Sequence, residues 1–150
     1  MDAPNPPESL DWAGAPSKVN PPLNQGDICG CTYSIVAIGA VESLYFIKQG
    51  NLPVLSTQQI TDCSSDYGNE GCFGGFMDQA FWYMIDYGVA SAEDYPYVMD
   101  KKNNCYYTIN MRYARFIKCA KVPLGNYRKL LSAIVQQPVS VAVNYNKAMS

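Results

Sequence analysis

Histidine is absent from this 150-residue sequence, so the chain by itself offers no imidazole as a catalytic base, a catalytic acid or a metal ligand. Charge is also scarce: charged residues make up 16% of the chain and the net charge is −2, which excludes the basic surface typical of nucleic-acid binding. No apolar run approaches the roughly 18 residues that a membrane-spanning helix requires. The first residues lack the basic and apolar regions of a secretory signal, so we expect either a leader removed earlier or another route of secretion.

The sequence does contain enough apolar material for a folded domain. Hydrophobic residues make up 48% of the chain, which argues against disorder. A chain of this length buries roughly 70% of the surface that it exposes when unfolded, so one ordinary core is expected. The 12 tyrosines fit either an adhesive surface or ordinary packing of rings whose hydroxyls reach water.

The cysteines point to disulfides. They are Cys29, Cys31, Cys63, Cys72, Cys105 and Cys119. A zinc site would require closely paired cysteines or histidine partners, and this scattered pattern provides neither. An even number of scattered cysteines favours disulfides over free thiols, and disulfides form in an oxidising compartment. We therefore expect a secretory, lysosomal or extracellular location, and neither a metal nor another cofactor.

The apolar pattern predicts a mainly helical chain. Residues 1–28 carry six prolines and are expected to form an extended segment laid over a domain. Apolar residues recur at helical spacing over residues 32–48, which predicts a long, largely buried central helix that Gly50 ends. A capping pattern at Ser56 opens a short helix that runs to about Cys63. The remaining expected elements are a glycine-rich loop at 64–75, helices at 76–87 and 126–137, and strands at 112–122 and 139–143.

The most distinctive motif is Cys29-Gly30-Cys31-Thr32-Tyr33, which follows Asn24-Gln25-Gly26. It resembles C-G-[SA]-C-[WY], the nucleophile motif of the papain-like cysteine peptidases, which lies at the start of a long helix. Further motifs with counterparts in that family occur in the same order at residues 7–12, 56–63, 71–75, 95–97 and 137–141.

The resemblance implies an α+β, papain-like fold. The chain would contain the helical left lobe around a long central helix, and only the first strand of the β-rich right lobe. On this basis residues 1–28 are the extended N-terminal segment, residues 29–111 the helical left lobe, and residues 112–150 the start of the right lobe.

The resemblance also implies which residue replaces the nucleophile. The spacing from Cys29 to Glu42 matches the family's spacing from its first motif cysteine to a helix glutamate, which puts a one-residue insertion at residues 27–28. In this register Cys31 takes the small Ser/Ala position and Thr32 takes the nucleophile position. A rival register makes Cys31 the nucleophile, but it turns every helical side chain by roughly 100° relative to the core. Alternatively, Cys31 is simply a small buried residue.

Other positions carry over from the family. Gln25 matches the oxyanion-hole glutamine. Gly74 and Gly75 match the glycines along which a substrate backbone runs, and Phe76 and Met77 match the lining of the main specificity pocket. Each pair also has a structural interpretation, because glycines permit a tight loop and apolar residues pack a helix against its neighbour.

The resemblance implies disulfides between Cys29 and Cys72 and between Cys63 and Cys105. Cys31 and Cys119 are left to pair with each other, to stay free or to link to another chain.

The favoured function is that of a catalytically inactive papain-like homologue, a pseudoenzyme with a structural, assembly or peptide-binding role. A threonine hydroxyl cannot replace the thiolate of the family's nucleophile. Silicateins, papain relatives that build mineral-associated filaments, also carry a hydroxyl residue followed by Tyr at this place, as Thr32-Tyr33 does here.

The alternative is an active papain-like cysteine endopeptidase that uses Cys31. The family's histidine and asparagine lie roughly 130–150 residues beyond the nucleophile, so they would come from a missing segment or a second chain. Because a half-fold exposes the apolar face of its helix, we expect a second lobe, a companion chain or another peptide or protein partner to cover it.

Overall fold

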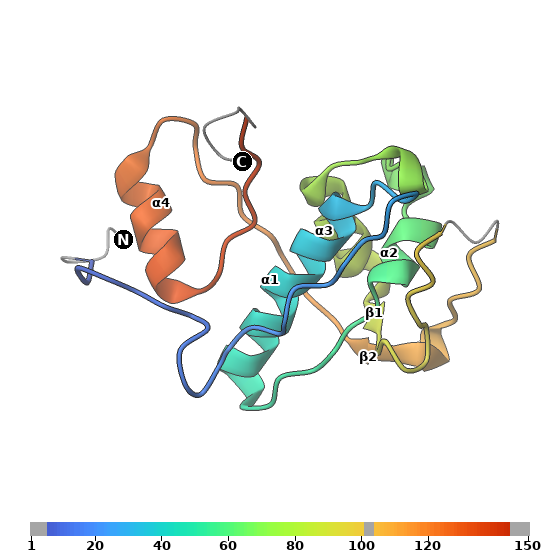
Figure 1. Cartoon of the computed structure of the whole chain (residues 1–150), viewed down its shortest axis with the longest axis horizontal. Helices are drawn as coiled ribbons and strands as arrows, with labels where there is room; N and C mark the ends of the chain where they lie inside the picture. The colour runs from blue at the N-terminus through green and yellow to red at the C-terminus, as the bar shows by residue number, and fades with distance from the viewer. Residues whose placement is uncertain (1–5, 101–103, 145–150) are drawn as a thin grey trace.

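The computed structural model describes residues 6–100 and 104–144. The helices and strands are, in chain order, α1 (Thr32–Gln49), α2 (Thr57–Cys63), the 3-10 turns η1 (Ser65–Tyr67) and η2 (Gly71–Phe73), α3 (Met77–Tyr87), β1 (Val89–Ala90), the 3-10 turn η3 (Ile109–Met111), β2 (Arg112–Ala114) and α4 (Tyr127–Gln136). Helix α1 crosses the middle of the molecule, with α2 and α3 on one side and α4 set apart on the other (Figure 1).

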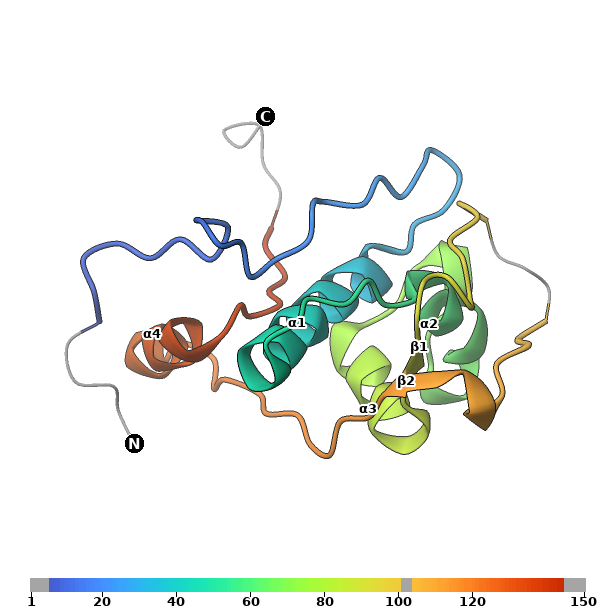
Figure 2. The same ribbon diagram turned by 90° about the horizontal axis from the view of Figure 1, so that it is seen from below.

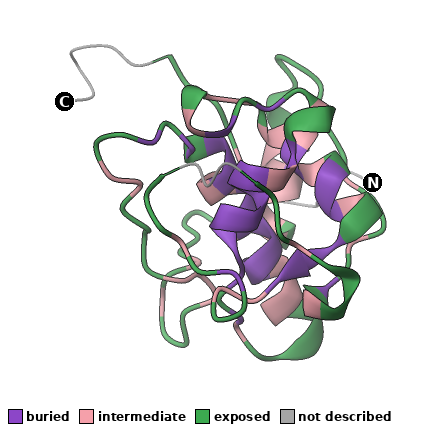
Figure 3. Cartoon of the chain, turned by 90° about the vertical axis from the view of Figure 1, so that its right-hand side faces the viewer, coloured by how far each residue is buried: buried purple, intermediate pink, exposed green. Residues whose placement is uncertain are grey.

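The long central helix expected from the apolar spacing is confirmed. Helix α1 ends at Gln49 because Gly50 adopts a left-handed conformation, with φ of 83°, and its N–H donates to the Phe46 carbonyl. The buried face of α1 includes Ala37, Ile38 and Val41, which belong to the hydrophobic core that α2 and α3 complete. Figure 3 shows the buried residues gathered in the middle of the molecule and the exposed ones on its loops.

Helix α2 is polar, yet it is buried. The Ser56 hydroxyl caps it by accepting from the Gln59 N–H, and donates to the Tyr95 carbonyl at 2.6 Å. The Gln59 side chain does not close the capping box; its amide nitrogen donates to the Tyr83 hydroxyl and its oxygen accepts from the Ala90 N–H. Since buried polar groups require partners, these bonds allow a polar helix to lie inside the domain.

The sheet is smaller than the sequence predicts. Strands β1 and β2 pair antiparallel, with Val89 opposite Ala114. The strand expected over residues 112–122 ends at Ala114. A strand continues only where a neighbour supplies backbone partners, and β1 is two residues long.

The expected helix after this sheet is confirmed, whereas the strand expected after that helix is wrong. Helix α4 begins at Tyr127, and the Asn126 side chain caps it by accepting from the Lys129 N–H at 3.0 Å. The described residues at 139–143 form no strand. Alternating apolar residues form a strand only beside a partner strand, and among the described residues none pairs with this segment. The first strand of a right lobe is therefore not formed here.

The N-terminal segment is extended, as its prolines predict. Described residues 6–31 contain neither helix nor strand, and Figure 2 shows them running alongside α1 and α4. Side-chain hydrogen bonds attach the segment to the rest of the chain: the Trp12 indole donates to the Ile134 carbonyl at 3.0 Å, and the Asn20 amide donates to the Pro53 carbonyl at 2.7 Å.

Two disulfides, Cys29–Cys72 and Cys63–Cys105, join the pairs that the resemblance implied, and Cys31 and Cys119 are free thiols. Such disulfides are compatible with the secretory pathway or a lysosome. In the described part of the chain, no helix combines the length and the apolarity needed to cross a bilayer.

Candidate functional site

The start of α1 is fixed against the glycine-rich loop. The Cys29–Cys72 disulfide links the residues before α1 to η2, and the Gly30 N–H donates to the Cys72 carbonyl at 2.8 Å. These two bonds bring residues 25–32 and residues 72–76 to one place in the fold.

Thr32 is the first residue of α1, and its side chain is exposed. Its hydroxyl donates to the side-chain oxygen of Gln25 at 2.7 Å. The structure thus brings together the two residues to which the resemblance assigned the nucleophile and oxyanion positions. An amide oxygen is no base at neutral pH, so this hydrogen bond holds the hydroxyl in place without activating it.

Cys31, directly before the helix, is fully buried. Its sulfur lies 3.0 Å from the Tyr97 hydroxyl, which itself donates to the Gln25 carbonyl at 2.8 Å. Because a phenol has one proton to donate, the thiol must be the donor in the contact between Cys31 and Tyr97. Burial, reinforced by the Cys31 thiol, raises the pKa of Tyr97 and keeps its hydroxyl protonated. Cys31 is therefore part of the packing beneath the site.

The two loop glycines differ in their surroundings. Gly74 has φ of 119°, and a Cβ there would meet nothing within 4 Å, so its backbone borders open space. A Cβ on Gly75 would lie 2.4 Å from Asn69 Oδ1 and 3.0 Å from the Tyr33 ring. Gly75 is thus required for the packing of the loop, whereas Gly74 borders open space on its Cβ side and its carbonyl accepts from the Glu70 N–H at 2.9 Å.

Phe76 and Met77, the neighbouring apolar residues, also differ in their exposure. Phe76 is 66% exposed at the start of α3, and Phe73 in η2 is 86% exposed. Met77 is half-buried and packs against the hydrophobic core. Only Phe76 of the predicted pair is available at the surface.

Two residues that organise this site were not assigned a role from the sequence. Asn69 is buried; it accepts from the Phe76 N–H at 2.8 Å and donates to Ser64 Oγ at 2.9 Å. Tyr97 connects Cys31 to the Gln25 backbone. The motif at residues 95–97 contains Tyr97 and was the one feature of the sequence that pointed to this residue. Neither periodicity nor spacing reveals which groups the side chains of Asn69 and Tyr97 bind.

No group of three or more His, Cys, Asp or Glu residues able to hold a metal occurs among residues 6–100 and 104–144. The side chains gathered at the site are an amide, a hydroxyl, a buried thiol and apolar rings. They suit binding of a polypeptide backbone better than the ligation of a cation.

Comparison with known proteins identifies the family. Residues 6–150 match the family described as papain family cysteine protease. The chain is 40% identical over 139 residues to cysteine proteinase 3 of Dictyostelium discoideum, covering 92% of this chain and 41% of that protein. It is 40% identical over 144 residues to cathepsin S of Bos taurus, covering 92% of this chain and 42% of that protein.

Solved structures give the same result. Digestive procathepsin L 3 of Tenebrio molitor larval midgut superposes with a TM-score of 0.81 at 35% identity, covering 89% of this chain and 43% of that one. A recombinant stem bromelain precursor gives a TM-score of 0.78 at 36% identity, covering 88% of this chain and 42% of that one. The fold is therefore papain-like and corresponds to the helical lobe. The chain belongs to the papain family of cysteine proteases, and it spans about two fifths of the length of these relatives.

Proposed function

We propose that this protein is a catalytically inactive papain-family member that acts by binding or by assembly. The observation that carries the proposal is Thr32 at the start of α1, with its hydroxyl hydrogen-bonded to Gln25. A cysteine at such a place works as a thiolate, whose pKa is lowered by a helix N-terminus and by a neighbouring imidazolium. A threonine hydroxyl forms no such ion pair, and its branched Cβ restricts χ1.

The alternative, an active endopeptidase that uses Cys31, is less well supported. A nucleophile must reach the substrate, and Cys31 is fully buried with its thiol donating to Tyr97. To expose Cys31, helix α1 would have to turn by roughly 100°, which would remove Ala37 and Val41 from the core.

Of the proposed roles, the glycine-rich loop favours binding of an extended peptide. Gly74 leaves its backbone facing open space, and the exposed rings of Phe73 and Phe76 flank it. An extended peptide could lie along this open side of the loop while its side chains contact the rings. A structural, silicatein-like role is the other form, and it would use the same inactive site as part of an assembly surface.

Thiol labelling of the full chain tests the inactive site. We expect iodoacetamide to modify Cys119, which is half-buried, at least tenfold faster than the fully buried Cys31. Thr32→Cys should gain a rapidly labelled thiol, because Thr32 is exposed, whereas the control Thr32→Ser should label like the wild type. Peptide mapping by mass spectrometry locates each label.

Two results would overturn the proposal. The first is labelling of Cys31 as rapid as that of Cys119. The second is cleavage of a fluorogenic papain-type peptide by the wild-type protein that is blocked when Cys31 becomes labelled. Rapid labelling would show that Cys31 is accessible, and cleavage blocked by its labelling would assign the nucleophile to Cys31; either result would restore the peptidase alternative.

A further inference from the structure

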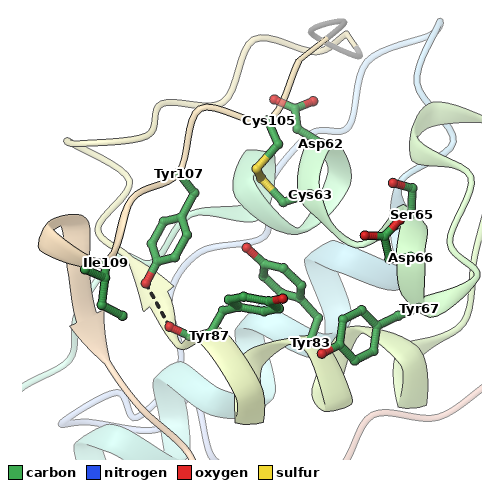
Figure 4. A pocket seen from close by; sticks show the side chains of 10 residues that line it. All are labelled: Asp62, Cys63, Ser65, Asp66, Tyr67, Tyr83, Tyr87, Cys105, Tyr107 and Ile109. Atoms are coloured by element: carbon green, nitrogen blue, oxygen red, sulfur yellow. Dashed lines mark hydrogen bonds between the residues drawn. A yellow bond between two sulfur atoms is a disulfide. The ribbon is translucent and has the colours of Figure 1, made fainter.

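A cavity of about 560 Å³ lies away from the start of α1. It opens between the end of α2, the turn η1, helix α3 and the chain segment after Cys105, and neither Gln25, Cys31 nor Thr32 lines it. Four of its lining residues are tyrosines: Tyr67, Tyr83, Tyr87 and Tyr107. Figure 4 shows the rings of Tyr83 and Tyr87 at the centre, Tyr67 on one side, Tyr107 on the other and the Cys63–Cys105 disulfide at the rim.

The rings hold one another in a defined arrangement. Tyr83 and Tyr87 are stacked with centroids 5.1 Å apart, and Tyr67 meets Tyr83 edge-on at 5.8 Å. The Tyr107 hydroxyl donates to the Tyr87 carbonyl at 2.8 Å, which fixes the opposite wall. Tyr83 is almost fully buried, whereas Tyr87 is 48% exposed. One outer ring of the stack is therefore open to a ligand.

Tyr67, Tyr83 and Tyr107 have raised pKa values, so their rings are neutral aromatic faces at neutral pH. The hydrogen bond to Asp86 raises the pKa of Tyr67 to about 12, and burial raises the pKa of Tyr83 to about 12. Burial also raises the pKa of Tyr107, although the nearby charge of Arg112 acts in the opposite direction.

The charges around the cavity are mostly negative. The exposed carboxylate of Asp66 lines one side, and the Tyr67 hydroxyl donates to Asp86 just outside. Asp62 also lines the cavity and accepts hydrogen bonds from Tyr95 and Gln58. None of the described residues that line it is a lysine or an arginine. The positive charge of Arg112 acts on Tyr107, and Figure 4 shows Tyr107 and Asp66 on opposite sides of the cavity.

We propose that this tyrosine-lined cavity binds an organic cation carrying a methylated ammonium group. The negative face of an aromatic ring attracts such a cation, and several rings around one cavity are the usual means of recognising it. The carboxylates of Asp66 and Asp86 add long-range attraction. An anion would be repelled by these carboxylates, and a divalent metal would require several oxygen ligands that converge on one point.

The experiment compares two probes of the same shape and different charge. Choline carries a trimethylammonium group, and 3,3-dimethylbutan-1-ol replaces that nitrogen by carbon. The full chain is titrated with each probe, and binding is followed by NMR from the shifts of the tyrosine ring protons. We expect choline to bind about tenfold more tightly than the neutral alcohol, the difference that a cation–aromatic contact typically provides.

Variants at Tyr87 separate the ring from its hydroxyl. Tyr87→Leu should weaken choline binding about tenfold, whereas Tyr87→Phe keeps the aromatic face and should bind like the wild type. Tyr127→Leu, which removes an exposed tyrosine of α4, is the matched control and should have no effect. Asp66→Asn should weaken choline binding and leave the binding of the alcohol unchanged. Far-UV circular dichroism checks that each variant is folded.

Equal affinity for the two probes would overturn the proposal, because an apolar pocket alone would then explain binding. Loss of binding in Tyr87→Phe would also overturn it, since the hydroxyl rather than the ring would be the recognition element. If choline does not bind to the folded wild-type protein, the cavity does not have this function. None of these outcomes bears on Thr32 or on the proposed inactivity.

Discussion

At the scale of single residues, Glu42 shows how burial couples the fold to pH. It lies in α1 with 5% of its surface exposed, and its carboxylate accepts from the Leu55 N–H at 2.7 Å. Burial raises its pKa above the ordinary value of 4.5, although hydrogen bonds from Leu55 and Asn20 act in the opposite direction. The folded state thus binds this proton more tightly than the unfolded chain does. Its contribution to stability is present at low pH and is lost as the pH rises from about 4.5 through the folded-state pKa.

Glu42→Gln tests this coupling, because the amide oxygen still accepts from Leu55 but carries no charge. We expect the stability of the variant relative to the wild type to be greater at pH 7 than at pH 4. This increase in the relative free energy of unfolding is about 1.4 kcal/mol for each unit by which the pKa of Glu42 is raised. Urea unfolding at the two pH values measures it, with the exposed Asp27→Asn as the control. A difference between variant and wild type that is the same at both pH values would contradict the pKa shift.

Residue identity alone could not separate the roles of neighbouring positions in the candidate site. Gly74 and Gly75 belong to one motif, and only the folded position of Asn69 shows that Gly75 is required for packing while Gly74 is open. The sequence likewise left Cys31 as a nucleophile or a buried residue. In the structure Cys31 is buried and contacts Tyr97, which lies 66 positions further along the chain. Local sequence patterns do not reveal a contact over such a separation.

At the scale of elements, Gly39 is a weak point in the interior of α1. A Cβ at Gly39 would meet no atom within 4 Å, and a glycine within a helix costs about 0.5–1 kcal/mol relative to alanine. Gly39→Ala should therefore raise the free energy of unfolding by about that amount, measured by urea unfolding. Gly75→Ala is the matched contrast and should lower it, because its Cβ would clash with Asn69. A loss of stability in Gly39→Ala would contradict the open surroundings of this position.

The helices were predictable from the sequence, whereas the extent of the strands was not. Within residues 6–100 and 104–144, the four α-helices begin within one residue of their expected starts, because helical periodicity, caps and terminal glycines are local signals. The strand expected at 112–122 forms only over Arg112–Ala114, and the strand expected at 139–143 does not form, for a common reason. Residues 115–122 and 139–143 have strand-like composition, but a strand depends on a partner elsewhere in the chain, and among the described residues they have none.

At the scale of the whole molecule, the C-terminal half leaves large apolar side chains uncovered. Ile117 is 83% exposed and Leu124 is fully exposed, and Tyr127 and Val143 are each more than 60% exposed. Helix α4 contributes one buried residue, Ser132, so this part of the chain adds little to the core around α1. Apolar surface of this kind favours contact with another polypeptide, which fits the assembly role proposed above.

The whole molecule should therefore associate in solution. We expect light scattering coupled to size-exclusion chromatography to give a mass above the 16.6 kDa of one chain. The double variant Ile117→Ser/Leu124→Ser removes two of the most exposed apolar side chains and should shift the mass toward that of one chain. Lys118→Ser, in the same segment, is the control and should leave the mass unchanged. A wild-type protein that elutes as one chain at every concentration would show that this surface does not drive self-association, and would leave a different polypeptide as the partner to seek.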